Sequence, residues 1–231
     1  MKIKDKIYSR GYWLAIIRPS TFIEDRISDI ADLYTIIEKN VVKFRGWDYP
    51  HLDYDSRHID KDWIGEDFQW EDHITSWRFS PTGLFCHLSG MRMDWRDESS
   101  IWNVDENWEP CTHLGIGQVI YQYSEILELA SRLSMSKAGG NQMYIRVEVG
   151  NLKNRQLYMD DSRRVGLFGD YQTKMGKFPY EIEISKSDLI SNSGDIAVDA
   201  SAELLKRFNW DIEKDRISSL QEEYINRYSF H

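Results

Sequence analysis

The sequence predicts an α+β fold in which a mostly antiparallel sheet carries its helices on one face. Three observations support this class. A strand, a helix, a hairpin, a second helix and a strand follow one another between residues 12 and 149. Hydrophobic residues alternate in the strands and recur every three or four positions in the helices. No tract rich in Pro, Gly or Ser divides the 231 residues, so we expect a single domain over residues 1–231.

The first two elements are a buried strand and a long helix. The strand is the apolar run 12–17, which closes at Pro19. Thr21 and Glu24 have the spacing of a capping box, so the helix is expected to begin near residue 20. A stripe of apolar residues predicts about six turns ending at Gly46. The stripe consists of Ile23, Ile27, Ile30, Tyr34, Ile37, Val41 and Phe44.

A hairpin, a helix and a strand follow. The hairpin is predicted from His73 to Met91, with a turn at Pro81-Thr-Gly83. The second helix covers 119–133, and residues 143–149 alternate as a strand does. Together with the first two elements they form a β-α-β-β-α-β order, which is the ferredoxin-like arrangement.

The remaining chain is expected to add strands, helices and two loops. Strands are predicted at 156–159 and 180–184, and two C-terminal helices at 195–208 and 217–228. The segments 47–71 and 93–110 show neither the helical nor the strand periodicity of apolar residues and are expected to be loops.

The negative charge and the tryptophans are concentrated in the middle of the chain. The formal net charge is −9, and residues 46–113 contain fifteen acidic and only five basic residues. The same segment contains seven of the nine tryptophans and five of the six histidines. We expect a loop-rich insert whose tryptophans either pack a second small core or form a recognition surface. Because phosphate neutralisation needs Lys and Arg, direct nucleic-acid binding is expected to be weak or absent.

The composition also bounds the compartment and the cofactors. No run of about 18 apolar residues occurs, so no membrane span is expected. Two cysteines, Cys86 and Cys111, make no disulfide framework, which favours a reducing cytoplasm. The sequence contains no P-loop and no complete dinucleotide-binding glycine motif, and we expect no cofactor.

The candidate binding residues lie in two short strings, residues 44–51 and 77–79. Arginine suits bidentate or stacked contacts, and tryptophan suits flat ones. The helix end and the hairpin are anchored to the same sheet, so we expect these residues to share one surface region. The alternative is a helix stop in which the arginine caps carbonyls and the tryptophan folds onto the core. The candidates are Arg45, Trp47, His51, Trp77 and Arg78.

A metal site is the second candidate. His51, Asp53, Asp55 and His58 lie within eight residues, and metal ions accept carboxylate and imidazole ligands. Such a site would support a metal-dependent nuclease or phosphodiesterase. The Asp…Glu-x-Lys order expected on paired strands is missing, and dense acids in a solvated segment usually form surface. We therefore expect no metal in the favoured interpretation.

Five strings of the sequence carry a family resemblance, and they are Phe44–His51, Asp62–Gly65, Ser76–Phe85, Met93–Arg96 and Phe208–Asp211. They resemble an uncharacterised bacterial domain that occurs alone or attached to Schlafen/Alba-type proteins thought to bind ATP or DNA. The hairpin turn of that domain usually reads Ser-Gly-Gln-Phe, whereas this chain has Ser80-Pro-Thr-Gly-Leu-Phe85. The resemblance implies an accessory or sensing role beside nucleic-acid machinery or in phage defence, and it assigns no catalytic residue.

The sequence therefore favours a non-enzymatic recognition or sensing module that binds a protein partner or a small ligand. The metal-dependent nuclease or phosphodiesterase is the alternative. A third interpretation is a structural subunit whose aromatic surface is buried in a homo-oligomer.

Overall fold

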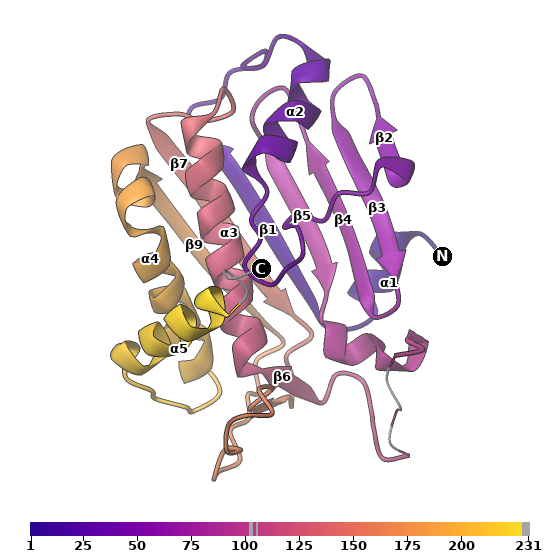
Figure 1. Ribbon diagram of the computed structural model, residues 1–231, viewed down its shortest axis with the longest axis vertical. Coiled ribbons are helices and arrows are strands. Elements are labelled where there is room, and N and C mark those ends of the chain that lie inside the picture. The colour runs from indigo at the N-terminus through magenta and orange to yellow at the C-terminus, as the bar shows by residue number, and fades with distance from the viewer. Residues whose placement is uncertain (102–103, 105, 228–231) are drawn as a thin grey trace.

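A seven-stranded antiparallel sheet runs through the molecule in the order β2-β3-β4-β5-β1-β7-β9 (Figure 1). The computed structural model describes residues 1–101, 104 and 106–227. In chain order its elements are α1 (Ile3–Tyr8), β1 (Tyr12–Pro19), α2 (Ile30–Asn40), η1 (Tyr54–Ser56), β2 (Arg57–Ile59), β3 (Ile64–Trp70), β4 (His73–Phe79), β5 (Phe85–Gly90), η2 (Arg92–Glu98), β6 (His113–Gly115), α3 (Ile116–Met135), β7 (Gln142–Gly150), β8 (Gln156–Tyr158), β9 (Lys177–Ser185), α4 (Lys186–Lys206) and α5 (Lys214–Asn226).

The centre of the sheet has the ferredoxin-like arrangement that the sequence predicts. Its strands lie in the order β4-β5-β1-β7. The chain leaves β1 through α2 and forms β2 and β3 before it reaches β4 on the far side of β5, and the connection from β5 through α3 passes over β1 to reach β7. Strands β2 and β3 extend one edge of this core, and β9 extends the other. The predicted α+β class and the antiparallel sheet are confirmed.

Helices α2, α3, α4 and α5 cover one face of the sheet, with α3 in the middle (Figure 1). Trp13 and Ile17 of β1 and Val147 of β7 are buried beneath this layer. On the other face α1, which has no counterpart among the predicted elements, packs against β4 and β5. Its Ile7 is buried in a small cluster with Trp95. The main core therefore lies between the sheet and the four larger helices.

The predicted first helix is too long at both ends. Only Ile30–Asn40 is helical, and the side chain of Asp29 caps it by accepting from the amide of Ala31 at 2.9 Å. The residues before it form a loop, in which the Ile27 amide donates to the carbonyl of Pro81 at 3.0 Å. A tertiary contact with the hairpin turn thus replaces the capping box at residue 20, because local helix signals are weaker than packing.

The predicted loop over 47–71 is wrong in its second half, where β2 and β3 add two strands to the sheet. The apolar alternation of β3 is interrupted by Glu66, whose side chain is fully buried. This carboxylate accepts from the Asp53 amide at 2.7 Å and from the Tyr34 hydroxyl at 3.1 Å. Because this buried glutamate stands where an apolar residue would be expected, the hydrophobic alternation that identifies a strand is broken, and β3 is missed. The middle segment therefore supplies β2–β5 rather than an insert.

The tryptophans of the middle segment divide between core and surface. Trp95 is buried in the small cluster with Ile7, as the small-core interpretation expects, whereas Trp77 is buried in the main core. Trp47 and Trp70 are 39% and 48% exposed and stack on each other with ring centroids 5.6 Å apart. Trp102 lies outside the described residues.

The C-terminal half departs from the prediction in the pairing of one strand and in the start of one helix. β8 pairs with β6 in a separate parallel ladder rather than with the main sheet. α4 begins before the predicted residue 195, because the hydroxyl of Ser185 caps it by accepting from the Asp188 amide at 3.1 Å. Within the described residues, no helix has both the length and the apolar character needed to cross a membrane.

Truncation of Ile37 tests the packing of α2. Ile37 is fully buried, so Ile37→Ala should lower the free energy of unfolding by about 2–5 kcal/mol through lost burial and a residual cavity. Ile23, which is 47% exposed, provides the control. Ile23→Ala should change the free energy of unfolding by less than about 0.5 kcal/mol. Urea denaturation measures both variants. Equal effects would show that the face of α2 bearing Ile37 is not core.

Candidate functional site

A cavity of about 520 Å³ lies between the β4–β5 hairpin, helix α3 and the loop that follows α2. Small-molecule sites usually have volumes of roughly 300–1,000 Å³. The cavity is on the helix-covered side of the sheet, toward the end of the hairpin where β4 begins and β5 ends. Its volume therefore suits a small-molecule site.

The floor of the cavity is formed by polar side chains on the β4–β5 hairpin. Thr75 of β4 lies opposite Ser89 of β5. His87, two residues before Ser89 on β5, faces the same side of the sheet. Toward the hairpin turn, the residues on this face become apolar, and the paired side chains Phe79 and Phe85 lie in the core. This face thus changes from apolar to polar where the cavity opens.

The roof is the loop between α2 and η1, which folds back on itself. Val42 and Tyr49 exchange two backbone hydrogen bonds of 2.9 and 2.8 Å. Gly46 has a positive φ of 76° at the turn, a conformation that residues with a side chain adopt at a cost. This folded loop places Arg45 and Trp47 at the edge of the cavity.

An ion pair joins the roof to α3. The Nε of Arg45 donates to Glu125 Oε1 at 2.8 Å, and its Nη2 donates to Glu125 Oε2. The side chain of Glu125 is 1% exposed. Bidentate arginine–carboxylate pairs fix geometry as well as charge. Arg45 therefore does not cap the end of α2, as the alternative interpretation expected, but ties the loop to the neighbouring helix.

A tyrosine–histidine contact connects the roof to the floor. The Tyr49 hydroxyl lies 3.1 Å from His87 Nδ1, and both side chains are buried. Burial disfavours the charged forms, so it lowers the pKa of His87 to about 3 and raises the pKa of Tyr49 well above its usual value. Both groups are uncharged at neutral pH.

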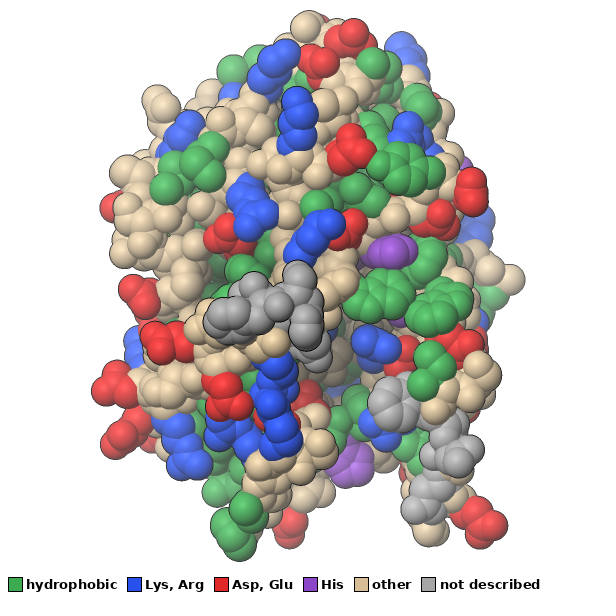
Figure 2. Space-filling view, in the orientation of Figure 1, with side chains coloured by type: hydrophobic (Ala, Val, Ile, Leu, Met, Phe, Trp, Pro, Cys, Tyr) green, Lys and Arg blue, Asp and Glu red, His purple; other side chains and the backbone are tan. Residues whose placement is uncertain are grey.

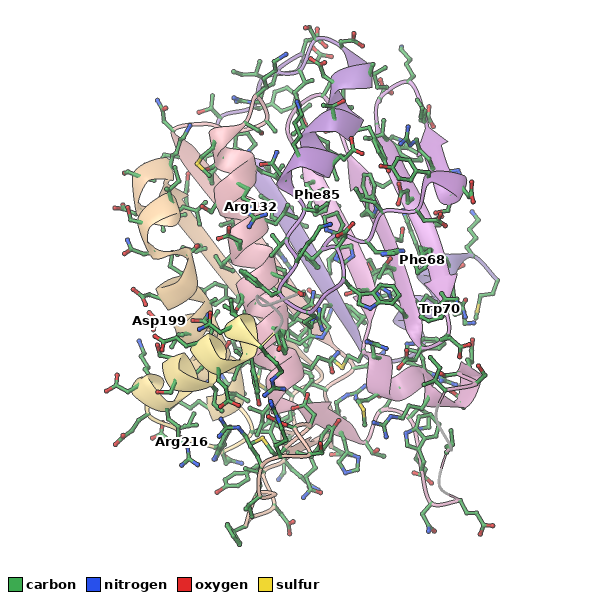
Figure 3. The ribbon with its side chains drawn as sticks, viewed as in Figure 1. Phe68, Trp70, Phe85, Arg132, Asp199 and Arg216 are labelled. Carbon is green, nitrogen blue, oxygen red and sulfur yellow. The ribbon has the colours of Figure 1, made fainter. Side chains whose placement is uncertain are left out.

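Two further histidines lie among aromatic rings at the β3 side of the cavity. The ring of His51 is 4.1 Å from that of Phe68, and the ring of His73 is 5.3 Å from that of Trp47. Burial lowers the pKa of His73 to about 3 and also lowers that of His51. Figure 3 labels Phe68 on β3, and Figure 2 shows a histidine beside hydrophobic side chains over this part of the sheet.

Six buried polar atoms on residues that line the cavity have no hydrogen-bond partner among the described residues. They are Thr75 Oγ1, Ser89 Oγ, His87 Nε2, His51 Nδ1, Gln122 Nε2 and Arg227 Nε. Buried polar groups in folded proteins are nearly always paired, and each unpaired one costs about 1–3 kcal/mol. All six line one space, so a molecule that entered the cavity would meet several free hydrogen-bonding groups.

Asp160 closes the cavity at the N-terminus of α3. Its carboxylate accepts from the amides of Gly117 at 2.6 Å and Gln118 at 2.9 Å. Burial raises the pKa of Asp160, and these two hydrogen bonds oppose the rise. The amides that commonly bind an anion at a helix N-terminus are thus used by a side chain of the protein itself.

A second cavity of about 240 Å³ adjoins the first and shares Arg45, Arg92 and Arg227 with it. Arg92 pairs with Asp72 at 2.8 Å, and Arg227 pairs with Asp161 at 2.8 Å. The three arginines that the two cavities share are therefore held by carboxylates of the same chain.

The five candidate binding residues are separated by the structure. Arg45, Trp47 and His51 line the cavity. Trp77 lies beneath it, 1% exposed, and its Nε1 donates to the carbonyl of His51 at 3.1 Å. Arg78 points to the opposite face of the sheet, because neighbours along a strand alternate, and pairs there with Asp67. Its role in binding remains a prediction.

The residues of the candidate metal site do not converge. The side chain of Asp53 accepts from the amide of Asp55 and caps η1. Over the described ranges of the chain, no group of three or more His, Cys, Asp or Glu side chains is placed to hold a metal ion. The metal-site prediction of His51, Asp53, Asp55 and His58 is thus without geometric support in that part of the chain.

Sequence reasoning missed Thr75, Ser89 and the polar wall residues Gln122 and Glu125. A usable signal was present on the hairpin, where pairing the two strands around the Pro81-Thr-Gly83 turn places Thr75 opposite Ser89 on the core face. Gln122 and Glu125 carry a similar signal, since they stand on a helix that is buried almost along its whole length.

No protein-family model matches the chain, and neither the curated proteins nor the solved structures contain a significant match to it. The resemblance to the uncharacterised bacterial domain therefore rests on the sequence strings alone.

Two serines on adjacent strands test whether the cavity hydroxyls lack a partner. Ser89 and Ser76 are both buried, but Ser76 Oγ donates to Asp67 at 2.7 Å. In the ligand-free protein, Ser76→Ala should lower the free energy of unfolding by about 1 kcal/mol, and Ser89→Ala should lower it by less than about 0.5 kcal/mol or raise it. Chemical denaturation measures both. An equal loss in the two variants would mean that Ser89 is bonded within the protein.

Proposed function

We propose that the protein is a non-enzymatic recognition or sensing module that binds a small ligand in the cavity between β4, β5, α3 and the loop after α2. The observation that carries the proposal is the set of unpaired polar atoms that line this cavity, among them those on Thr75, Ser89, His87 and His51. They surround a space of about 520 Å³, which is large enough for a metabolite-sized molecule. A bound ligand would supply the missing hydrogen bonds.

A small ligand accounts for these atoms better than a protein partner does. Thr75 and His87 are 1% and 3% exposed, so a flat protein surface would not reach them. The exposed stacked pair Trp47 and Trp70 lies at the edge of the same region. We propose that this aromatic pair transmits ligand binding to a protein partner, since Trp47 also lines the cavity.

The cellular role is proposed from the sequence strings. Their resemblance to a domain that accompanies nucleic-acid-related proteins supports an accessory role in such machinery, including phage defence. The acidic balance of residues 46–113 argues that the contact is with a protein or ligand rather than with nucleic acid directly.

Ligand capture tests the proposed function. The purified protein is mixed with a small-molecule extract of bacterial cells, freed of unbound compounds by gel filtration, and denatured so that mass spectrometry can identify what it retained. We expect at least one retained compound that raises the melting temperature of the protein. Ser89→Leu, which places an apolar side chain in the cavity, should retain none.

Ser187→Leu is the matched control, because Ser187 is exposed on α4 and does not line the cavity. This variant should retain the compound as the wild type does. A wild-type protein that retains nothing, or a Ser89→Leu variant that folds and retains the same compound, would contradict the proposed function.

A further inference from the structure

Five of the six unpaired atoms of the cavity belong to groups that carry no charge. The sixth is Nε of Arg227, whose guanidinium is paired with Asp161 and Glu223. Thr75 and Ser89 offer hydroxyls, which both donate and accept hydrogen bonds. His87 offers Nε2 of a neutral imidazole, which donates or accepts according to its tautomer. These groups match hydroxyl, amide or ring-nitrogen groups on a ligand and provide no countercharge.

The charged side chains that line the cavity are already compensated. Three are basic and three are acidic among the described lining residues. Arg45 pairs with Glu125, and Arg92 and Arg227 pair with aspartates outside the cavity. Asp48 pairs with Lys43 at 3.0 Å. A charged ligand would therefore enter a site whose charges are balanced before it arrives.

The helix N-terminus does not change this balance. The amides of Gly117 and Gln118 are bonded to Asp160, which itself lines the cavity. An incoming phosphate or carboxylate would meet this acid instead of free amides. The usual reason for an anion to bind at the start of a helix is thus removed here.

Aromatic side chains provide the apolar part of the site. Tyr49 and Tyr121 line the cavity and are nearly buried, and Trp47 stands at its edge. Flat aromatic faces pack against planar rings and against the C–H faces of sugars. The ligand should therefore combine an apolar face with several neutral hydrogen-bonding groups.

We propose that the cavity selects an uncharged, hydroxyl- or amide-bearing molecule and discriminates against its anionic and cationic relatives. This inference rests on the proposed function, because it assigns the ligand class of the same cavity. Nucleosides and neutral sugars share the required chemistry. Burying an uncompensated charge is costly, so charged relatives should bind more than about tenfold more weakly.

Two matched sets of probes test the selection. One contains adenosine and adenosine monophosphate, and the other contains N-acetylglucosamine, cationic glucosamine and N-acetylglucosamine 6-phosphate. Affinity is measured by ligand-observed NMR on the wild type, and binding that disappears in Ser89→Leu is assigned to the cavity. We expect the neutral member of at least one set to bind and its charged relatives to bind more than about tenfold more weakly.

A second variant examines the cause of the selection. Glu125→Gln leaves the charge of Arg45 without its carboxylate, so the preference should shift toward the anionic member of the set. Wild-type cavity binding of a charged member as tight as that of the neutral one would overturn the inference and leave the proposed function standing.

If neither set binds, the charge of the compound retained from the cell extract decides. A neutral compound supports the inference and a charged one overturns it. An extract from which nothing is retained overturns the proposed function itself.

Discussion

The register of the β4–β5 hairpin determines both the core and the cavity. It pairs Phe79 with Phe85 under the helices and, two pairs along the same face, Thr75 with Ser89. A shift of one residue would turn every one of these side chains to the opposite face of the sheet. The apolar pair holds this register by burial, and the polar pair uses it to present hydroxyls to one space. Stability and the proposed recognition therefore depend on the same strand pairing.

The walls of the cavity follow from that arrangement. Because β5 lies beside β1 in the ferredoxin-like order, α3 crosses above β1 next to the hairpin and brings Gln122 and Glu125 to the wall of the cavity. Glu125 then holds the loop after α2 through Arg45. The unpaired atoms inside carry an energetic cost that a protein selected only for stability would remove. Their concentration in one cavity is the physical argument for a ligand.

Much of the fold could be predicted from the sequence, because hydrophobic periodicity reports local burial. The strand of β7 and the helix α3 were predicted to within a few residues, and the order of elements gave the ferredoxin-like core. β3 could not be predicted, since Glu66 is buried by contacts with Tyr34 and the Asp53 amide that only the tertiary structure provides. The first helix was overpredicted because its stripe of apolar residues continues into segments held by tertiary contacts.

The candidate site was predicted only in part, for a related reason. The string Arg45–His51 was distinctive because it combines charged, aromatic and turn residues, and its cavity-lining members were found. Arg78 was grouped with Trp77 by closeness in the chain, although alternation along β4 sends it to the other face. Thr75 and Ser89 are common residue types that draw no attention in the sequence. They become informative once the strand register places them opposite each other and the structure shows that their buried hydroxyls have no hydrogen-bond partner.

A high-resolution crystal structure of the protein purified rapidly from its host cells tests the central claim most directly. The account predicts that the cavity contains an ordered molecule, or waters in its place, hydrogen-bonded to Thr75 Oγ1, Ser89 Oγ and His87 Nε2. A cavity closed by protein side chains, with these three atoms bonded to other groups of the chain, would contradict it.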